Sequence, residues 1–200
     1  MSYREILTAE HGHILRMLNV MREACVGIVR GEAVDTADFW QMVGFIRNYV
    51  GEQHHCKEED FLFRAIADEL GERGRVLVKQ GMMLEHELAR IPATDLERAL
   101  IGYEAQPDDR ARLGILVAAG GYEQTMRRNI RKEDGVIYPY AVRRLSDEGV
   151  RWLAERMGEF DGEALREANR DRQLAELAAL EEKYATQSAA PPEGSAAQSV

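Results

Sequence analysis

Hydrophobic residues recur every three or four positions along most of this chain, and no long stretch alternates hydrophobic with polar residues. Such spacing is typical of helices that bury one face, whereas alternation would indicate strands. The first stripe advances by four and three residues in turn and comprises Leu7, His11, Ile14, Leu18, Met21, Cys25 and Ile28. Because this repeat lets helices pack along a common seam, the pattern predicts an all-α helical bundle.

Capping and helix-breaking residues predict where the first helices begin and end. Ser2 and Glu5 have the spacing of a capping box, and Gly31 is expected to end the first helix. Further helices are predicted at about residues 35–70, 75–91 and 94–103. The helix over 75–91 is expected to stop before Pro92, because proline lacks the backbone N–H that a helix interior requires.

The second half of the chain carries the start signals of three more helices. The first opens at Pro107 and Asp108, and Pro139 is expected to kink or restart it. The second is capped by Ser146 and Asp147 and runs to about Phe160. The third covers residues 163–184 and is capped by Asp161. The whole pattern predicts an up-down-up-down four-helix bundle with additional C-terminal helices.

The composition divides the chain into three predicted parts. Residues 1–160 are expected to form the helical bundle, and residues 161–185 a charged C-terminal helix. Residues 186–200 are rich in Ser, Ala, Pro and Gly, so they are predicted to be a disordered tail. The charged helix either covers the bundle or pairs with a second copy, so the sequence is consistent with a monomer or a homodimer.

Charge and cysteine content exclude several classes of function. The 26 Lys and Arg residues against 35 Asp and Glu residues leave a net charge of −9, which disfavours binding to nucleic acid. No apolar run is long enough to cross a membrane, and the first residues do not resemble a signal peptide. Two cysteines 31 positions apart fit a reducing compartment, so we expect a cytoplasmic protein.

Two segments of the chain resemble each other and carry candidate metal ligands. Each contains a Lys-Glu-acid triplet, and the glutamate follows a polar residue by four positions: His54 precedes Glu58, and Asn129 precedes Glu133. This spacing puts the two side chains on one helix face, about 6 Å apart along the axis. The adjacent pair, His55 and Glu59, is an alternative register for the same helix.

Two further helices contribute one candidate histidine each, His11 and His86. His11 occupies a seam position between hydrophobic residues, where an imidazole is costly to bury without a partner. Buried carboxylates beside imidazoles on facing helices indicate a bound cation, and mixed His and Glu ligands suit iron, manganese or zinc. Carboxylates that can bridge two cations favour a two-iron site inside a four-helix bundle.

These motifs together resemble the hemerythrin-like (HHE cation-binding) family over residues 1–160. The matching segments are Glu10-His11-x-x-Ile14, His54-x-x-x-Glu58-Glu59-x-x-Leu62-Phe63, Glu85-His86, Lys132-Glu133-Asp134-x-x-Ile137-Tyr138-Pro139 and Arg144-Leu145-Ser146. The resemblance implies a four-helix bundle that holds two iron ions, Fe²⁺ or Fe³⁺, with an oxo or hydroxo bridge. By position, the implied ligands are His11, His54, Glu58, His86 and Glu133.

The sequence departs from the family pattern at two positions. Asn129 stands where the family places a histidine, and Met82 stands where oxygen carriers have a second histidine on the third helix. An amide oxygen is a weak iron ligand, so we expect an under-ligated iron with an open position near Asn129. Tyr122, Tyr138 and Tyr140 are candidate phenolate ligands, and the expected neighbours of the site are Tyr122, Met126 and Cys56.

The sequence therefore predicts a di-iron oxidoreductase that reacts with dioxygen, peroxide or nitric oxide, with an organic substrate left open. One alternative is a module that binds or senses oxygen, nitric oxide or iron without catalysis and signals through its C-terminal helix. Another is a structural bundle whose metal site has decayed, as the change to Asn129 would indicate.

Overall fold

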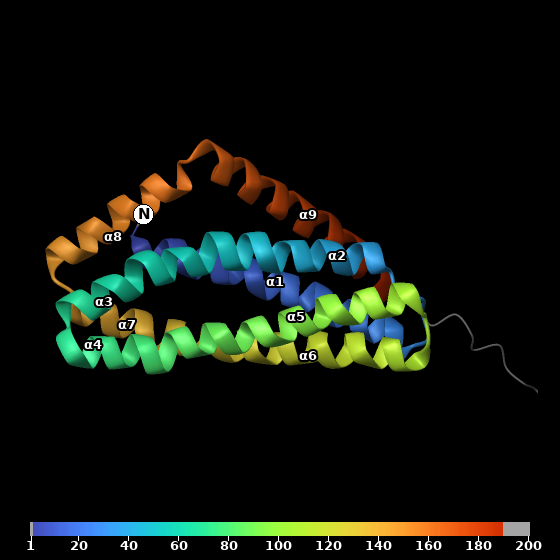
Figure 1. The fold of residues 1–200 in the computed structure, drawn as a ribbon. Helices are drawn as coiled ribbons and strands as arrows, with labels where there is room; N and C mark the ends of the chain where they lie inside the picture. The colour runs from blue at the N-terminus through green and yellow to red at the C-terminus, as the bar shows by residue number, and fades with distance from the viewer. Residues whose placement is uncertain (1, 190–200) are drawn as a thin grey trace, which may run out of the picture.

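The computed structural model describes residues 2–189, and every regular element in that range is a helix (Figure 1). The α-helices are α1 (Tyr3–Val29), α2 (Thr36–Phe45), α3 (Phe63–Glu69), α4 (Gly71–Leu77), α5 (Met83–Ala105), α6 (Asp109–Lys132), α7 (Tyr138–Arg144), α8 (Asp147–Asp161) and α9 (Ala164–Ala189). Four π-helical segments join them: η1 (Ile46–His55), η2 (Glu58–Leu62), η3 (Val78–Met82) and η4 (Glu133–Ile137). The predicted all-α helical bundle is confirmed.

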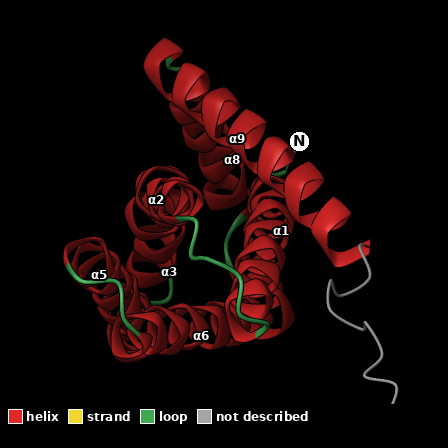
Figure 2. Ribbon diagram, turned by 90° about the vertical axis from the view of Figure 1, so that its right-hand side faces the viewer, coloured by secondary structure: helices red, strands yellow, loops and turns green. Residues whose placement is uncertain are grey.

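Seen along its axis, the bundle places α1, α2, α5 and α6 around a common centre (Figure 2). The predicted capping box at the start of α1 is present, since Ser2 and Glu5 each accept the other's backbone N–H. The chain leaves α1 through Gly31, whose φ of 93° lies in the left-handed region that glycine adopts without strain.

The predicted end of a helix before Pro92 is wrong, because α5 continues through this residue to Ala105. Proline removes the backbone hydrogen bond that residue 92 would donate to the carbonyl of Leu88, yet the helix continues on both sides of it. The Pro92 ring also packs against Gly121 of α6, where an added Cβ atom would lie 3.5 Å from the ring, at ordinary contact distance. Packing between α5 and α6 therefore outweighs the local break, and no separate helix begins after Thr94.

Helices α8 and α9 form an arch over α1 and α2 (Figure 1). Ser146 caps α8 as predicted, but Asp161 does not cap α9. Asp161 is the last residue of α8, and its carboxylate accepts hydrogen bonds from Lys57 and Gln53 of the bundle. Helix α9 extends to Ala189, and residues 190–200 of the predicted disordered tail lie outside the described residues.

Two hydrophobic clusters fill the interior, and polar residues lie between them on each helix of the bundle. Along the chain, the polar positions that separate the clusters are His11 in α1, His54 to Glu58 between η1 and η2, His86 in α5, and Glu133 at the start of η4. The core is therefore interrupted at one level by a layer of ionisable side chains. Among the described residues, no helix is long and apolar enough to cross a membrane.

Candidate metal centre

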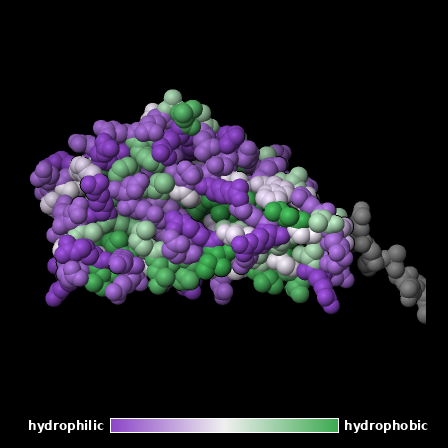
Figure 3. Space-filling view, in the orientation of Figure 1, coloured by the Kyte–Doolittle hydropathy of each residue, from purple (hydrophilic) through white to green (hydrophobic). Residues whose placement is uncertain are grey.

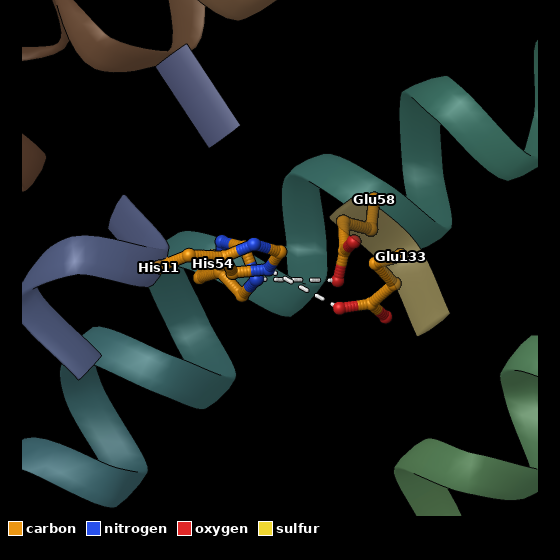
Figure 4. A group of neighbouring side chains, drawn as sticks. All are labelled: His11, His54, Glu58 and Glu133. Atoms are coloured by element: carbon orange, nitrogen blue, oxygen red, sulfur yellow. Dashed lines mark ion pairs between the residues drawn. The ribbon is translucent and has the colours of Figure 1, made fainter. Parts of the chain in front are cut away.

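Four of the predicted ligands converge at one point inside the bundle (Figure 4). They come from three helices, with His54 and Glu58 one turn apart on the same one, and each offers a nitrogen or oxygen atom within 4.8 Å of the others: His11 of α1, His54 of η1, Glu58 of η2 and Glu133 of η4. Each of these side chains is at most 1% exposed. The His11 Nε2 atom lies 3.2 Å from Glu133 Oε2, and the His54 Nε2 atom lies 3.4 Å from Glu58 Oε2.

The fifth predicted ligand, His86 of α5, contacts both glutamates of this cluster. Its Nε2 atom lies 3.3 Å from Glu58 Oε2 and 3.4 Å from Glu133 Oε1. Each glutamate therefore faces two histidines. We refer to these five residues as the candidate metal centre.

A carboxylate outside the centre holds the second ring nitrogen of each histidine. The Nδ1 contacts are His11 with Asp134 at 2.9 Å, His54 with Glu10 at 3.0 Å and His86 with Glu59 at 2.7 Å. Such a carboxylate fixes the tautomer, so that Nε2 faces a cation with its lone pair. The roles of Glu10 and Asp134 were not predicted, although each is adjacent in sequence to a predicted ligand.

The alternative register, His55 with Glu59, is also brought inside the bundle. The His55 ring stacks on His86 with 3.9 Å between ring centroids, and burial lowers the pKa of His55 well below its usual value. His55, Glu59 and His86 form a second group with metal-ligand spacing. However, Glu59 also binds Arg90 at 3.0 Å, so its charge is already balanced. We therefore assign the inner position to His54 and Glu58, and this choice of ligands stays a prediction.

Ion pairing shifts the pKa values of His11, His86 and Glu133 in the direction that keeps each group charged. Burial alone would lower the pKa of His11, but hydrogen bonds to Asp134 and Glu133 raise it to about 10. The same balance raises the pKa of His86 to about 11 through Glu133, Glu58 and Glu59. The pKa of Glu133 is lowered because its contacts with His11 and His86 outweigh its burial. Without a metal, protons on His11 and His86 therefore balance charge on the neighbouring carboxylates.

Several buried polar atoms at the centre have no hydrogen-bond partner in the described part of the chain. They are His54 Nε2, Glu58 Oε2, Glu133 Oε2 and Asn129 Oδ1. The first three lie 3.2–3.4 Å from another ligand atom, but none of these contacts has the alignment of a hydrogen bond. Leaving such atoms unpaired is costly, and a bound cation would satisfy nitrogen and oxygen atoms of this kind together. The mixed imidazole and carboxylate set suits iron, manganese or zinc, so the residues fit the predicted metal.

Asn129 lies at the edge of the centre, 1% exposed, and its amide nitrogen donates to Glu133 Oε1 at 2.8 Å. Among the three candidate tyrosines, only Tyr138 reaches the centre within the described contacts. Its hydroxyl donates to Glu58 Oε1 at 2.6 Å and lies 3.2 Å from His11 Nε2. Burial raises the pKa of Tyr138 well above its usual value, so this residue acts as a hydrogen-bond donor.

The other expected neighbours lie farther from the ligand atoms. Met126 is fully buried in the larger hydrophobic cluster, and Tyr122 is buried with an unpartnered hydroxyl as far as the described residues extend. Cys56 is half-buried and forms no hydrogen bond to the centre in residues 2–189. Burial and nearby carboxylates raise the pKa of its thiol, which makes it a poor nucleophile.

A fully buried lysine next to the centre was missed in the sequence. Lys57 binds the carboxylate of Glu10, and its Nζ atom donates to Asp161 of α8 at 2.7 Å. Glu10 in turn holds His54, so a continuous chain of polar contacts connects α8 with the centre. A charge run such as Lys57-Glu58-Glu59 is usually solvated, and only the packing of α8 on this side explains the burial of its lysine.

Comparison with known families agrees with this geometry. The model of the hemerythrin HHE cation binding domain matches residues 3–141, which is more than half of the chain. The protein therefore belongs to the hemerythrin HHE cation-binding family, and its buried His and Glu cluster is the feature that suggests metal binding. Searches of curated proteins and of solved structures found no match. Helices α8 and α9 lie beyond the matched residues.

Proposed function

We propose that this protein binds two iron ions at the candidate metal centre and acts as an oxidoreductase on dioxygen, peroxide or nitric oxide. The convergence of three histidines and two glutamates from the four helices of the bundle carries this proposal. Glu58 and Glu133 each face two histidines, which is the arrangement that bridging carboxylates need. Bound iron would supply one-electron chemistry toward small oxidants.

The protein's own residues prepare the centre in three ways. Outer carboxylates orient the three imidazoles, and the Tyr138 hydroxyl positions Glu58 by donating to its Oε1 atom. Hydrophobic clusters on either side exclude bulk water. Asn129 offers a weaker ligand than histidine, which leaves a position for an oxidant on its side of the centre.

A second candidate function is a sensing module that binds oxygen, nitric oxide or iron without turnover. The chain of contacts from His54 through Glu10 and Lys57 to Asp161 favours it, because this chain connects the centre with α8. The sequence also allowed a third function, a structural bundle whose metal site has decayed. A protein of that kind would take up no metal.

The test is anaerobic loading with Fe²⁺, followed by removal of unbound metal and measurement of iron per chain and of the optical spectrum after oxidation. We expect about two irons and a near-ultraviolet band from an oxo-bridged pair. Turnover of peroxide or dioxygen then separates an enzyme from a sensor. Parallel loading with Mn²⁺ and Zn²⁺ identifies the preferred metal, and failure to bind any of the three ions would refute the proposal.

Two glutamate variants test the register. Glu58→Gln should abolish loading, because it removes a carboxylate that faces both His54 and His86. Glu59→Gln is the matched control, since its only contact with the five ligands in the described part of the chain is to the outer nitrogen of His86, and it should weaken binding without abolishing it. The reverse order of effects would assign the ligands to His55 and Glu59.

A further inference from the structure

A recess of about 500 Å³ opens between η1 and α5, next to the candidate metal centre. In Figure 3 this face is hollowed near the middle of the bundle, with hydrophobic atoms inside the hollow and polar side chains around it. The walls come from Ile46 and Val50 on one side and from Ala89 and Ala93 on the other. We call it the α5 recess. Its volume lies in the range of small-molecule pockets.

Small side chains on both helices explain why the recess exists. Gly51 of η1 and the two alanines of α5 lie along the same seam, and none of them reaches across it. Two ion pairs span the seam instead: Arg47 of η1 with Glu97 of α5, and Arg90 of α5 with Glu59 of η2. These pairs link the helices at their rims while the space between them stays open.

Two buried polar side chains, His55 and Tyr122, line the inner end of the α5 recess. They are only 5% and 2% exposed, and within residues 2–189 neither His55 Nε2 nor the Tyr122 hydroxyl has a hydrogen-bond partner. Such atoms are costly to bury unless something binds them. A hydrogen-bonding molecule in the recess would satisfy both.

The charges around the recess indicate a neutral ligand. Both arginines that line it are paired with glutamates, Arg47 with Glu97 and Arg90 with Glu59, so neither is left to bind an anion. The hydrophobic walls favour an apolar body. The His55 ring stacks on His86, so a molecule at the inner end would lie one side chain away from the metal ligands.

We propose that the α5 recess binds a small neutral organic molecule with an apolar body and one hydroxyl or carbonyl group, held by His55 Nε2 and the Tyr122 hydroxyl. This inference deepens the proposed function by giving an organic substrate a place beside the centre. Binding itself rests on the recess alone and does not require metal.

The experiment titrates phenol into the full chain, metal-free and iron-loaded, and follows binding by ligand-observed NMR, with benzene and benzoate as comparison probes. We expect saturable phenol binding in both forms. Benzene should bind roughly fivefold more weakly because it lacks the hydrogen-bonding group. Benzoate should also bind more weakly, because its charge would enter a recess without a free cation.

Two variants locate the bound probe. Tyr122→Phe should weaken phenol binding part of the way toward the level of benzene, because His55 Nε2 remains as a hydrogen-bond partner, and it should leave benzene binding unchanged. Ala93→Trp should fill the recess and abolish binding, whereas Ala105→Trp, at the exposed end of the same helix, is the matched control. Circular dichroism confirms that each variant is folded, and Tyr122→Phe remains decisive if Ala93→Trp does not fold.

Two results would overturn the proposal: the absence of saturable phenol binding, which would mean that only water satisfies His55 and Tyr122, or phenol binding that neither variant changes. Loss of iron uptake with intact phenol binding would contradict the proposed function and leave the recess proposal standing.

Discussion

The histidines of the centre owe their orientation to carboxylates on other helices. Asp134 of η4 holds His11 of α1, Glu10 of α1 holds His54 of η1, and Glu59 of η2 holds His86 of α5. Each outer acid is the sequence neighbour of a predicted ligand, so one short motif supplies a ligand and an orienting group. The same pairings make the centre sensitive to single substitutions and to pH.

Asn129→His should restore the nitrogen ligand that the family pattern places at this position. The side chain is buried and contacts Glu133, so an imidazole there would face the centre. We expect iron to be lost to a chelator at least tenfold more slowly than from the wild type. Gln124→His adds an exposed histidine to the same helix and should change nothing. Equal loss rates for both variants would place residue 129 outside the coordination sphere.

Metal uptake should release protons and strengthen as pH rises from 6 to 9. The raised pKa values of His11, about 10, and His86, about 11, mean that both carry a proton at neutral pH in the metal-free protein. A metal needs their lone pairs, so both protons must leave. Zinc titration in weak buffer with a pH indicator should record about two protons per loaded chain. An affinity independent of pH would contradict this prediction.

The metal-free protein should show the opposite dependence on pH. Because the folded-state pKa values of these two histidines are raised above the ordinary 6.5, their ion pairs contribute stability below that pH. This contribution is lost as the pH rises through about 10 to 11. Urea unfolding of the metal-free protein at several pH values would detect the loss.

At the scale of elements, π-helical turns coincide with the centre. His54 lies in η1, while Glu58 and Glu133 begin η2 and η4. A π turn contains an extra residue, which lets neighbouring side chains such as His54 and His55 both face the interior. Hydrophobic periodicity predicts the helix but not the π turns within it. A π turn displaces the spacing of hydrophobic residues by only one position, which is too small a change to recognise in the sequence. The alternative register therefore could not be excluded from the sequence.

Pro92→Ala should stabilise the protein by about 1–3 kcal/mol, because it restores a backbone hydrogen bond inside α5. Urea unfolding measures the change. Pro107→Ala is the control: this proline lies in the loop between α5 and α6, so its replacement restores no helical hydrogen bond and should have a smaller effect. A loss of stability in Pro92→Ala would show that the proline ring is needed against Gly121 of α6.

At the scale of the whole molecule, the arch of α8 and α9 completes the surroundings of the centre. Leu177, Leu180 and Tyr184 of α9 are buried in the larger hydrophobic cluster, so the charged helix covers the bundle. Asp161 enters from the end of α8 and binds the buried Lys57. The two helices beyond the family match are therefore part of the core rather than an independent appendage.

Lys57→Met should destabilise the protein by about 3–5 kcal/mol, because it leaves the carboxylate of Glu10 buried without its cation. Arg64→Met is the matched control, since it breaks an exposed pair with Asp68 that contributes little. Thermal and urea unfolding compare the two variants. A small effect at Lys57 would mean that Glu10 becomes protonated or reaches solvent when the lysine is removed.

Sequence periodicity and capping signals were sufficient for the helical bundle, the start of α1 and the cap of α8, because these depend on residues within one or two turns. The structure also brings the five predicted ligands close to one another, while their role as metal ligands stays a prediction. The sequence was insufficient at Pro92, where packing against α6 overrides a local break, and at Asp161, whose carboxylate pairs with a distant lysine instead of capping a helix. Both errors involve partners far away along the chain.

The order of hydrophobic and ionisable residues by itself determined the helices. It also determined where, along the buried face of each helix, histidines and glutamates replace hydrophobic residues. That information is local, since a polar residue within an apolar stripe faces the interior wherever its helix packs. Only the tertiary structure decided which carboxylate holds which imidazole, that Lys57 is buried beneath α8, and that small residues leave the α5 recess open. These features depend on contacts between helices, which a one-dimensional pattern does not contain.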